Sequence, residues 1–335
     1  MTLKTPQNDS FSALAKEFRD RLKGQQDILV TTHTSPDGDG VASALAGVEI
    51  LRLLGSEAVF CLSGDIPERY KFLPGSDRVI NWDISRDKKR TRALVVDCGS
   101  YARIGALTDA ISPDAELIVV DHHADNTRFG QLNIIHPECA STTQILFKLI
   151  RELELPVDKK LADLLFTGLL TDTGGFRFSN ADEEAFSTAT ELVKFGAHPH
   201  KIAEEVYSSN SLKSINILSD ALRSLELHAN GRVALMTVKN VNADEEPEDL
   251  SDYALWIKGV QASALFRLQD KLSRVSLRSR GSVKVDSIAH SFGGGGHPKA
   301  AGFTITDDSE VVKTQVIKAL SEEVDKRYPH TANQE

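Results

Sequence analysis

The stretch ELIVVDHHADN, residues 116–126, begins with a short apolar run and ends in a cluster of acidic and imidazole side chains. Two earlier stretches follow the same plan: RALVVD, residues 92–97, ends in an aspartate, and DILVTTH, residues 27–33, ends in a histidine. Short apolar runs without polar alternation are typical of strands buried on both faces of a parallel sheet. Because helical patterns separate these runs, the sequence predicts βαβ units and an α/β domain whose mostly parallel sheet is flanked by helices.

The C-terminal third has a different pattern and predicts a second domain. From residue 231 hydrophobicity alternates with period two in RVALMTV, ASALFRLQD and LSRVSLRS, which indicates antiparallel strands. We therefore expect a first domain over residues 1–190, a helical linker over 191–230 and a smaller α/β domain with a mixed or antiparallel sheet over 231–335. The acidic stretch 244–252 is expected to be a solvated loop or the start of a helix. The remaining predictions are a strand at 57–62 and helices at 12–22, 40–54, 142–153, 158–170, 182–195, 201–207, 211–227 and 310–327.

Composition narrows the class of protein. The 335 residues include 39 Lys and Arg against 48 Asp and Glu, a net charge of −9, which argues against a protein that grips long nucleic acid by general electrostatics. No run approaches the ~18 apolar residues of a membrane span, and the N-terminal MTLKTPQNDS lacks the apolar core of a signal peptide. We therefore expect no membrane contact. The cysteines are few, odd in number and widely spaced, so we also expect no disulfide framework and a cytoplasmic location; they are Cys61, Cys98 and Cys139.

Acidic and histidine residues follow the predicted strands where each strand ends. The carboxyl ends of parallel strands meet at one edge of a sheet, where ligands bind, so these side chains should converge. Several carboxylates brought together repel one another, and two divalent cations would balance four of them. Oxygen ligands with one imidazole per metal favour Mn²⁺, with Mg²⁺ or another divalent ion as alternatives. The candidate ligands are His33, Asp37, Asp39, Asp97, His122 and Asp172, with Asp97 as the bridge.

Taken singly, these residues also fit simpler roles. A lone aspartate at a strand end is usually a helix cap, and SPDGDG by itself is typical of a tight turn. Independent caps do not require histidines beside them, however, so the combination favours a metal site. Two metals can activate a water and stabilise a leaving oxygen in a phosphoryl displacement. Besides Asp97, the candidate catalytic residues are His123 and Asp121. Three roles are open for His123: it faces the phosphate, it acts as an acid, or it only supports a metal ligand. Asp121 is expected to orient an adjacent imidazole.

A second group of residues has the chemistry of an anion site. The stretch SFGGGGHPKAAGF, residues 291–303, exposes backbone N–H groups at Gly294, Gly295 and Gly296 and adds His297, although a flexible turn is an alternative. Arg278, from a preceding strand, can clamp a phosphate with two hydrogen bonds. Further candidates for substrate binding are Ser141 and Thr142 at a helix start, where plain capping is the alternative, and Arg103 just after Asp97.

These residues carry a family resemblance. HTSPDGDGVAS, VVDCGS, VVDHHADN and GLLTDTGGFRFSN resemble the four successive motifs of the DHH phosphoesterase superfamily, and FGGGGHPKAAGF resembles the signature of its DHHA1 domain. The chain length is similar to that of the NrnA-type oligoribonucleases, or nanoRNases. One minor departure is Ala181, where the family pattern has Thr after FRFSN.

The resemblance implies a two-manganese site in a cleft between a DHH domain and a DHHA1 domain. One metal would be held by His33, Asp37 and Asp97, and the other by Asp39, Asp97, His122 and Asp172. His123 would face the substrate, and Arg278, the glycine run and His297 would bind the rest of the nucleotide.

The function that follows is hydrolysis of very short RNA or DNA oligonucleotides to mononucleotides. Removal of the 3′-phosphate from a nucleotide bisphosphate, 3′-phosphoadenosine 5′-phosphate, is a second activity expected of this group. Two alternatives stay open: a phosphodiesterase for linear or cyclic dinucleotide messengers, and a non-catalytic, metal-dependent nucleotide sensor. Apolar helical faces and antiparallel strands are compatible with a homodimer, but no segment demands one.

Overall fold

The computed structural model describes residues 10–83, 88–241, 245–247, 250–269, 272–306 and 309–329. The chain divides into two compact units, Met1–Ser208 and Ser209–Glu335. Helices α5, Glu183–Lys194, and α6, Pro199–Ala203, and the π-helical turn η4, Glu204–Ser208, belong to the first unit. The predicted linker therefore contributes to both units. In the described part of the chain, no helix has the length and apolarity needed to cross a membrane.

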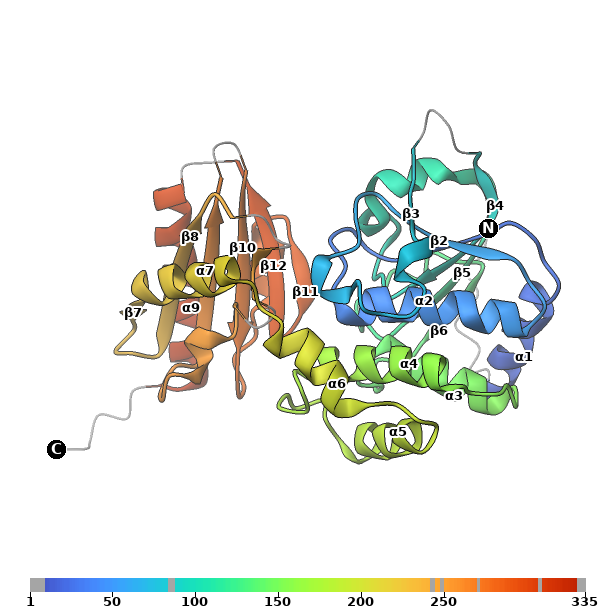
Figure 1. The fold of residues 1–335 in the computed structure, drawn as a ribbon. Coiled ribbons are helices and arrows are strands. Elements are labelled where there is room, and N and C mark those ends of the chain that lie inside the picture. The colour runs from blue at the N-terminus through green and yellow to red at the C-terminus, as the bar shows by residue number, and fades with distance from the viewer. Residues whose placement is uncertain are drawn as a thin grey trace. The chain divides into compact units, whose positions relative to one another are not determined.

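The first unit is built on a six-stranded sheet in the order β3-β2-β1-β4-β5-β6, drawn in blue and green in Figure 1. Every neighbouring pair is parallel. The predicted parallel sheet is thus confirmed. Its strands are β1 Ile28–Thr31, β2 Ala58–Leu62, β3 Ile80–Asn81, β4 Arg90–Val96, β5 Ile111–Asp121 and β6 Leu132–Ile135.

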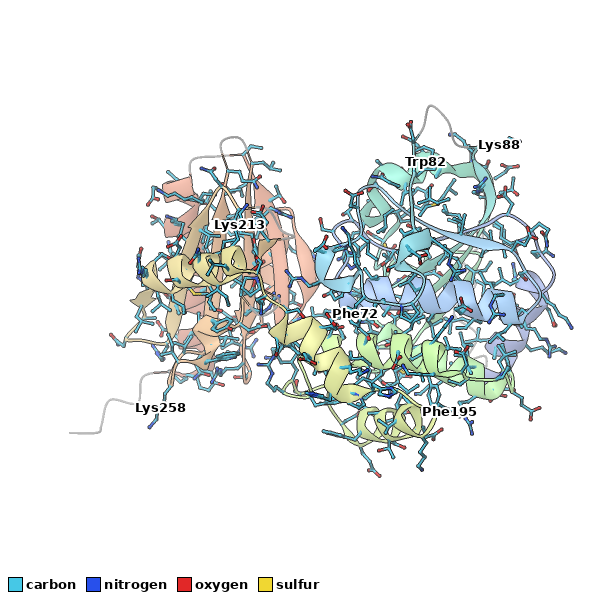
Figure 2. All side chains as sticks on the ribbon, viewed as in Figure 1. Phe72, Trp82, Lys88, Phe195, Lys213 and Lys258 are labelled. Atoms are coloured by element: carbon cyan, nitrogen blue, oxygen red, sulfur yellow. The ribbon has the colours of Figure 1, made fainter. Side chains whose placement is uncertain are left out.

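Helices cover the sheet because its strands are apolar on both faces. Val30 and Leu94 lie in the large core beneath α2, α3 and α4, whereas Leu29 and Val95 lie in a smaller core on the other face with Ile104 of the 3-10 segment η3. Phe195, labelled in Figure 2, follows α5 and places its ring 6.3 Å from that of Phe147 in α3. The helical elements are α1 Phe11–Leu22, α2 Gly38–Leu53, η3 Tyr101–Ala110, α3 Thr142–Glu152 and α4 Lys159–Asp172.

The strand order reverses between β1 and β4. The chain moves outward from β1 through β2 to β3, then returns beside β1 as β4 and continues through β5 to β6. In open parallel sheets the loops on either side of such a reversal leave a crevice at the carboxyl ends of the strands. The loops after β1 and β4, which carry His33 and Asp97, lie on either side of this point.

The second unit has its own six-stranded sheet, in the order β11-β12-β10-β9-β8-β7. Strands β8 and β9 are parallel and the other pairs are antiparallel, so the sheet is mixed, which is one of the two forms expected from the sequence. A long connection with the turn η6, Tyr253–Trp256, allows the chain to cross over before β9. The strands are β7 Glu226–His228, β8 Val233–Lys239, β9 Ala262–Leu268, β10 Ser273–Ser279, β11 Gly295–His297 and β12 Ala300–Ile305.

Helices cover both faces of this sheet. Residues of α8, Asp286–Ser291, and α9, Ser309–Arg327, join one core, and residues of α7, Leu212–Arg223, and η6 join the other. The sequence predicts a solvated acidic stretch at 244–252, but Glu246 and Asp252 are buried because each pairs with an arginine of the sheet. Positions 244, 248 and 249 lie outside the described residues.

Candidate metal centre

The loop between β1 and α2 contributes one histidine and two aspartates. Asp37 caps α2 by accepting a hydrogen bond from Gly40 N at 3.1 Å, and Asp39 lies in the first turn. A Cβ atom on Gly40 would lie 2.9 Å from the Thr32 hydroxyl and 3.3 Å from an Asp97 oxygen. Glycine is therefore needed here, because α2 passes so close to the end of β4.

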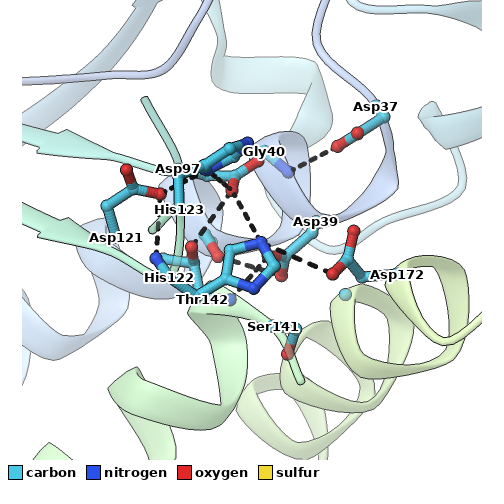
Figure 3. Close-up of polar contacts among 12 residues, drawn as sticks. Asp37, Asp39, Gly40, Asp97, Asp121, His122, His123, Ser141, Thr142 and Asp172 are labelled. Atoms are coloured by element: carbon cyan, nitrogen blue, oxygen red, sulfur yellow. Dashed lines mark hydrogen bonds and ion pairs between the residues drawn. The ribbon is translucent and has the colours of Figure 1, made fainter. Parts of the chain in front are cut away.

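Asp97, directly after β4, lies at the centre of the site. One carboxylate oxygen is 3.7 Å from Nε2 of His33, and the other is 3.7 Å from Nε2 of His122. The backbone of Asp97 has a φ of 50°, a left-handed conformation that is uncommon outside glycine and that turns the chain sharply at the strand end. Figure 3 shows Asp97, Asp39 and Asp172 around the two adjacent histidine rings.

Asp39 and Asp172 approach His122 from two helices. Asp172, the last residue of α4, lies 3.4 Å from His122 Nε2. Asp39 is held at the start of α3 by the backbone N–H groups of Thr142 and Thr143, at 2.6 and 3.1 Å. Ligand atoms of Asp39, His122 and Asp172 lie within 4.8 Å of one another, and the same holds for His33, Asp37 and Asp97.

His33 and His122, which both turn Nε2 toward Asp97, are oriented alike. Nδ1 of His33 lies 2.9 Å from the carbonyl of Thr34, and Nδ1 of His122 lies 3.3 Å from the carbonyl of Cys139. Because a carbonyl can only accept, each Nδ1 carries the proton. A neutral ring then presents the lone pair of Nε2 to the carboxylates, as metal-binding histidines do.

His123 is held in a different way. Its Nδ1 donates to Asp121 at 2.7 Å, and the same carboxylate oxygen accepts from the backbone N–H of His122 at 2.9 Å. The other Asp121 oxygen accepts from the Asn126 amide at 2.6 Å, and that amide also donates to the carbonyl of Cys98. Asp121 therefore fixes the position of His123 and of the backbone beneath His122.

Burial and neighbouring charges shift the pKa values of the residues in this cluster. Burial, and to a smaller extent the charge of Asp97, raises the pKa of Asp39 to about 7. Burial, and to a smaller extent the charge of Asp39, raises the pKa of Asp172 well above its ordinary value. Burial opposes the charge of Asp97, but His33 and the other imidazoles outweigh it and hold the pKa of Asp97 low. Burial also lowers the pKa of His33 and of His122, but Asp97 reverses this and raises both.

These residues fit a divalent metal centre. Without a cation, the cluster has to hold protons on carboxylates or imidazoles to limit repulsion. A divalent cation would replace those protons, and the donors are carboxylate oxygens and imidazole nitrogens with supported orientations. The structure brings together all six predicted ligands.

The other predicted site residues lie in varied surroundings. Arg103 is exposed, and its charge opposes protonation of His33. Ser141 and Thr142 are fully buried: the Ser141 hydroxyl caps α3, and the Thr142 hydroxyl donates to Asp97 at 3.1 Å. These two have a supporting role, and their contact with substrate stays a prediction.

In the second unit the glycine run is partly strand. Gly295, Gly296 and His297 form β11 and pair with β12, whereas Gly294 precedes it. Arg278 on β10 donates from Nε to Asp252 at 3.1 Å.

Sequence reasoning missed several supporting groups. Asn126 lies within VVDHHADN but has no predicted role, and Thr143 and Ser43 bind Asp39 alongside Thr142. Asn180 donates to the carbonyls of Ala140 and Asp172, which ties the loop after α4 to the start of α3. Only their position inside or beside the motifs pointed to them, because a hydrogen bond to a ligand has no spacing rule of its own.

Comparison with known proteins matches both units. Residues 27–169 match the model of the DHH family N-terminal domain, and residues 230–327 match that of the DHHA1 domain. A bifunctional oligoribonuclease and PAP phosphatase NrnA from Thermus thermophilus is 29% identical over 299 residues, covering 89% of this chain and 90% of that protein. The protein of the same name from Bacillus subtilis is 26% identical, covering 83% and 89%.

A solved structure supports the fold. An exopolyphosphatase-related protein from Bacteroides fragilis superposes with a TM-score of 0.81 at 24% identity, covering 94% of this chain and 97% of that one.

Proposed function

Because the chain belongs to the DHH phosphoesterase family and carries its DHHA1 domain, we propose that it hydrolyses very short oligonucleotides to mononucleotides and dephosphorylates 3′-phosphoadenosine 5′-phosphate. The observation that carries this proposal is the meeting of four carboxylates and two imidazoles at the reversal of the strand order. The names of the two NrnA relatives, which match over most of their length, support the substrate class.

The proposed cofactor is a pair of divalent ions, with Mn²⁺ preferred. His33, Asp37 and Asp97 would hold one, and Asp39, Asp97, His122 and Asp172 would hold the other. Such ions supply positive charge to a phosphate and lower the pKa of a bound water. Thr142 and Thr143 keep Asp39 in place for this role.

The protein's own groups would orient the substrate and move a proton. Asp121 holds Nδ1 of His123, so we assign Nε2 of His123 to contact the scissile phosphate or to protonate the leaving 3′-oxygen. Arg103 adds positive charge beside the centre. In the second unit, Arg278 with the glycine run and His297 would bind a terminal phosphate, which favours short substrates. The cytoplasmic location and the homodimer stay predictions.

The test measures kcat for a two-residue RNA in the presence of Mn²⁺ and compares the unmodified protein with two single variants, Asp97→Ala and His122→Ala. Replacing outer-shell partners of a metal typically costs 10–100-fold, so loss of a direct ligand should lower kcat at least ~100-fold. Asp114→Ala, an exposed acid elsewhere on β5, is the control and should be fully active. Full turnover in both site variants would contradict the assignment.

A substrate panel separates the alternatives. We expect turnover of a dinucleotide and of 3′-phosphoadenosine 5′-phosphate to exceed that of a long single strand. Preference for a dinucleotide messenger such as pApA over other dinucleotides would favour the messenger phosphodiesterase. Saturable binding without turnover at excess Mn²⁺ would indicate a sensor.

A further inference from the structure

Two arginines of the second unit lie on the same face of its sheet, and each pairs with an acid from the segment 245–252. Arg267 on β9 pairs with Glu246, and Arg278 on β10 pairs with Asp252. Arg267 also donates to the hydroxyl of Ser276 on β10, so these two side chains share a face. Arg278 is two residues from Ser276, and alternate strand residues point the same way.

All three nitrogens of Arg267 are bonded within the fold. Its Nε lies 2.6 and 2.7 Å from the two oxygens of Glu246, Nη1 donates to Ser276 at 2.7 Å, and Nη2 donates to Ser251 at 3.1 Å. The side chain of Arg267 is 13% exposed and that of Glu246 7%. This pair is structural, since its strong donors already face protein oxygens.

The guanidinium of Arg278 is bonded through two of its three nitrogens. Its Nε donates to Asp252 at 3.1 Å and its Nη1 to the carbonyl of Leu277 at 3.1 Å. Within the described ranges, Nη2 of Arg278 makes no hydrogen bond, and the side chain is 28% exposed, twice as much as that of Arg267. A guanidinium is planar, so two fixed nitrogens determine where the third points.

We infer that Asp252 is a positioning residue for substrate binding: it holds the guanidinium of Arg278 so that the remaining donors face the terminal phosphate of the substrate. This inference rests on the proposed role of Arg278. The carboxylate accepts from Nε and thereby leaves the outer end of the guanidinium for an anion. A preorganised arginine loses less side-chain freedom when the phosphate binds, so Asp252 lowers KM without contacting the substrate.

The experiment measures kcat and KM for a two-residue RNA in the full-length, Mn²⁺-loaded protein. We expect Asp252→Ala to raise KM about tenfold, as for other groups that orient a binding residue, and to change kcat by less than about twofold. Asp252→Asn should raise KM less, because its amide oxygen can still accept from Nε. The double variant with Arg278→Ala should be no worse than Arg278→Ala alone, since Asp252 acts only through Arg278.

The matched control is Glu246→Gln, which disturbs the paired but saturated Arg267. Glu246→Gln should lower the melting temperature and leave KM unchanged. If it raised KM as much as Asp252→Ala does, the effect of Asp252 on KM would be a general structural one. A wild-type or lower KM in folded Asp252→Ala overturns the inference, because a lower KM means that Asp252 competes with the phosphate. Should the alanine variant fail to fold, Asp252→Asn decides, and a wild-type KM there counts against the inference.

Arg278→Ala separates this inference from the proposed function. If Arg278→Ala leaves KM unchanged, the phosphate site proposed for the second unit is wrong, and the role of Asp252 falls with it. If Arg278→Ala raises KM and Asp252→Ala does not, only the role of Asp252 is wrong.

Discussion

Buried charges are arranged differently in the two units. In the first unit, carboxylates cluster at the strand ends, whereas in the second unit each buried acid is paired with an arginine. Around Asp97, carboxylates crowd one another, and the pKa of Asp39 rises to about 7. In the second unit, Arg267 and Arg278 each have a carboxylate of their own. The first arrangement would be completed by the proposed cations, whereas the second is balanced within the fold and has one donor group left for the proposed anion.

The largest expected effect is that of metal removal. Chelation should abolish turnover, and Mn²⁺ should restore it and raise the free energy of unfolding of the first unit, by ~2.7 kcal/mol for each bound ion at a metal concentration of 100 Kd. Hydrogen exchange reports the two units separately, and protection should increase around β1, β4 and β5 but not in β8–β10. Stabilisation by Mn²⁺ that persists in Asp97→Ala/His122→Ala would place the metal elsewhere.

The next largest effect is expected from adding a methyl group at Gly168. A Cβ atom there would lie 2.4 Å from an Asp39 oxygen and from Thr143, so α4 can approach the site only through glycine. We expect Gly168→Ala to cost about 1–3 kcal/mol of stability, measured by denaturant unfolding, and to weaken Mn²⁺ binding. Gly47→Ala in α2 is the control, because its Cβ would meet the side chains of Leu94 at 3.2 Å and Val30 at 3.5 Å and no group of the cluster. Equal effects of both substitutions would contradict the close packing at Asp39.

Loss of the Asn126 amide should affect turnover more than stability. Asn126→Ala removes hydrogen bonds to Asp121 and to the carbonyl of Cys98, so we expect kcat to fall about tenfold. Asn133→Ala is the matched control, because the side-chain amide of Asn133, on β6, bonds to the backbone of Gly130 and to no residue of the cluster within the described ranges. Equal kcat in the two variants would show that Asp121 keeps its place without Asn126.

The smallest effect concerns an ordinary ion-pair network in the first unit. Glu116 accepts from Arg21 at 2.7 Å and from Arg92 at 2.8 Å, and although burial opposes its charge, the two guanidinium groups lower its pKa below the ordinary 4.5. A lowered carboxyl pKa stabilises the fold above pH 4.5, and this contribution disappears as the pH falls through the lowered pKa. Glu116→Gln should therefore reduce unfolding free energy by about 1 kcal/mol at pH 7 and by nothing at acid pH.

The exposed pair of Glu68 with Lys71 provides the comparison for Glu116. Glu68→Gln should leave stability unchanged at both pH values, since exposed ion pairs contribute little. A difference between Glu116→Gln and the unmodified protein that persists at acid pH would show that packing rather than charge is responsible.

In the first unit, the sequence predicted the strands that carry continuous apolar runs and missed those that do not. β1, β4 and β5 were expected because burial on both faces demands continuous apolar residues. β3 was missed because it has two residues and Ile80 is 40% exposed, and the short β6 was missed as well. The parallel pairing of β8 with β9 left no local trace, because strand direction depends on the crossover between them.

By itself, the sequence determined which residues lie at strand ends and which chemical groups they carry, because hydrophobic period and residue type are local properties. Only the tertiary structure decided that β1 and β4 are neighbours at the reversal of strand order and that backbone carbonyls orient His33 and His122. It also decided that Arg267 is saturated while Arg278 keeps a donor, although both are arginines on adjacent strands. The physical reason is that hydrogen bonds and charge pairs depend on distance in space, which residues far apart in the chain acquire only when they pack.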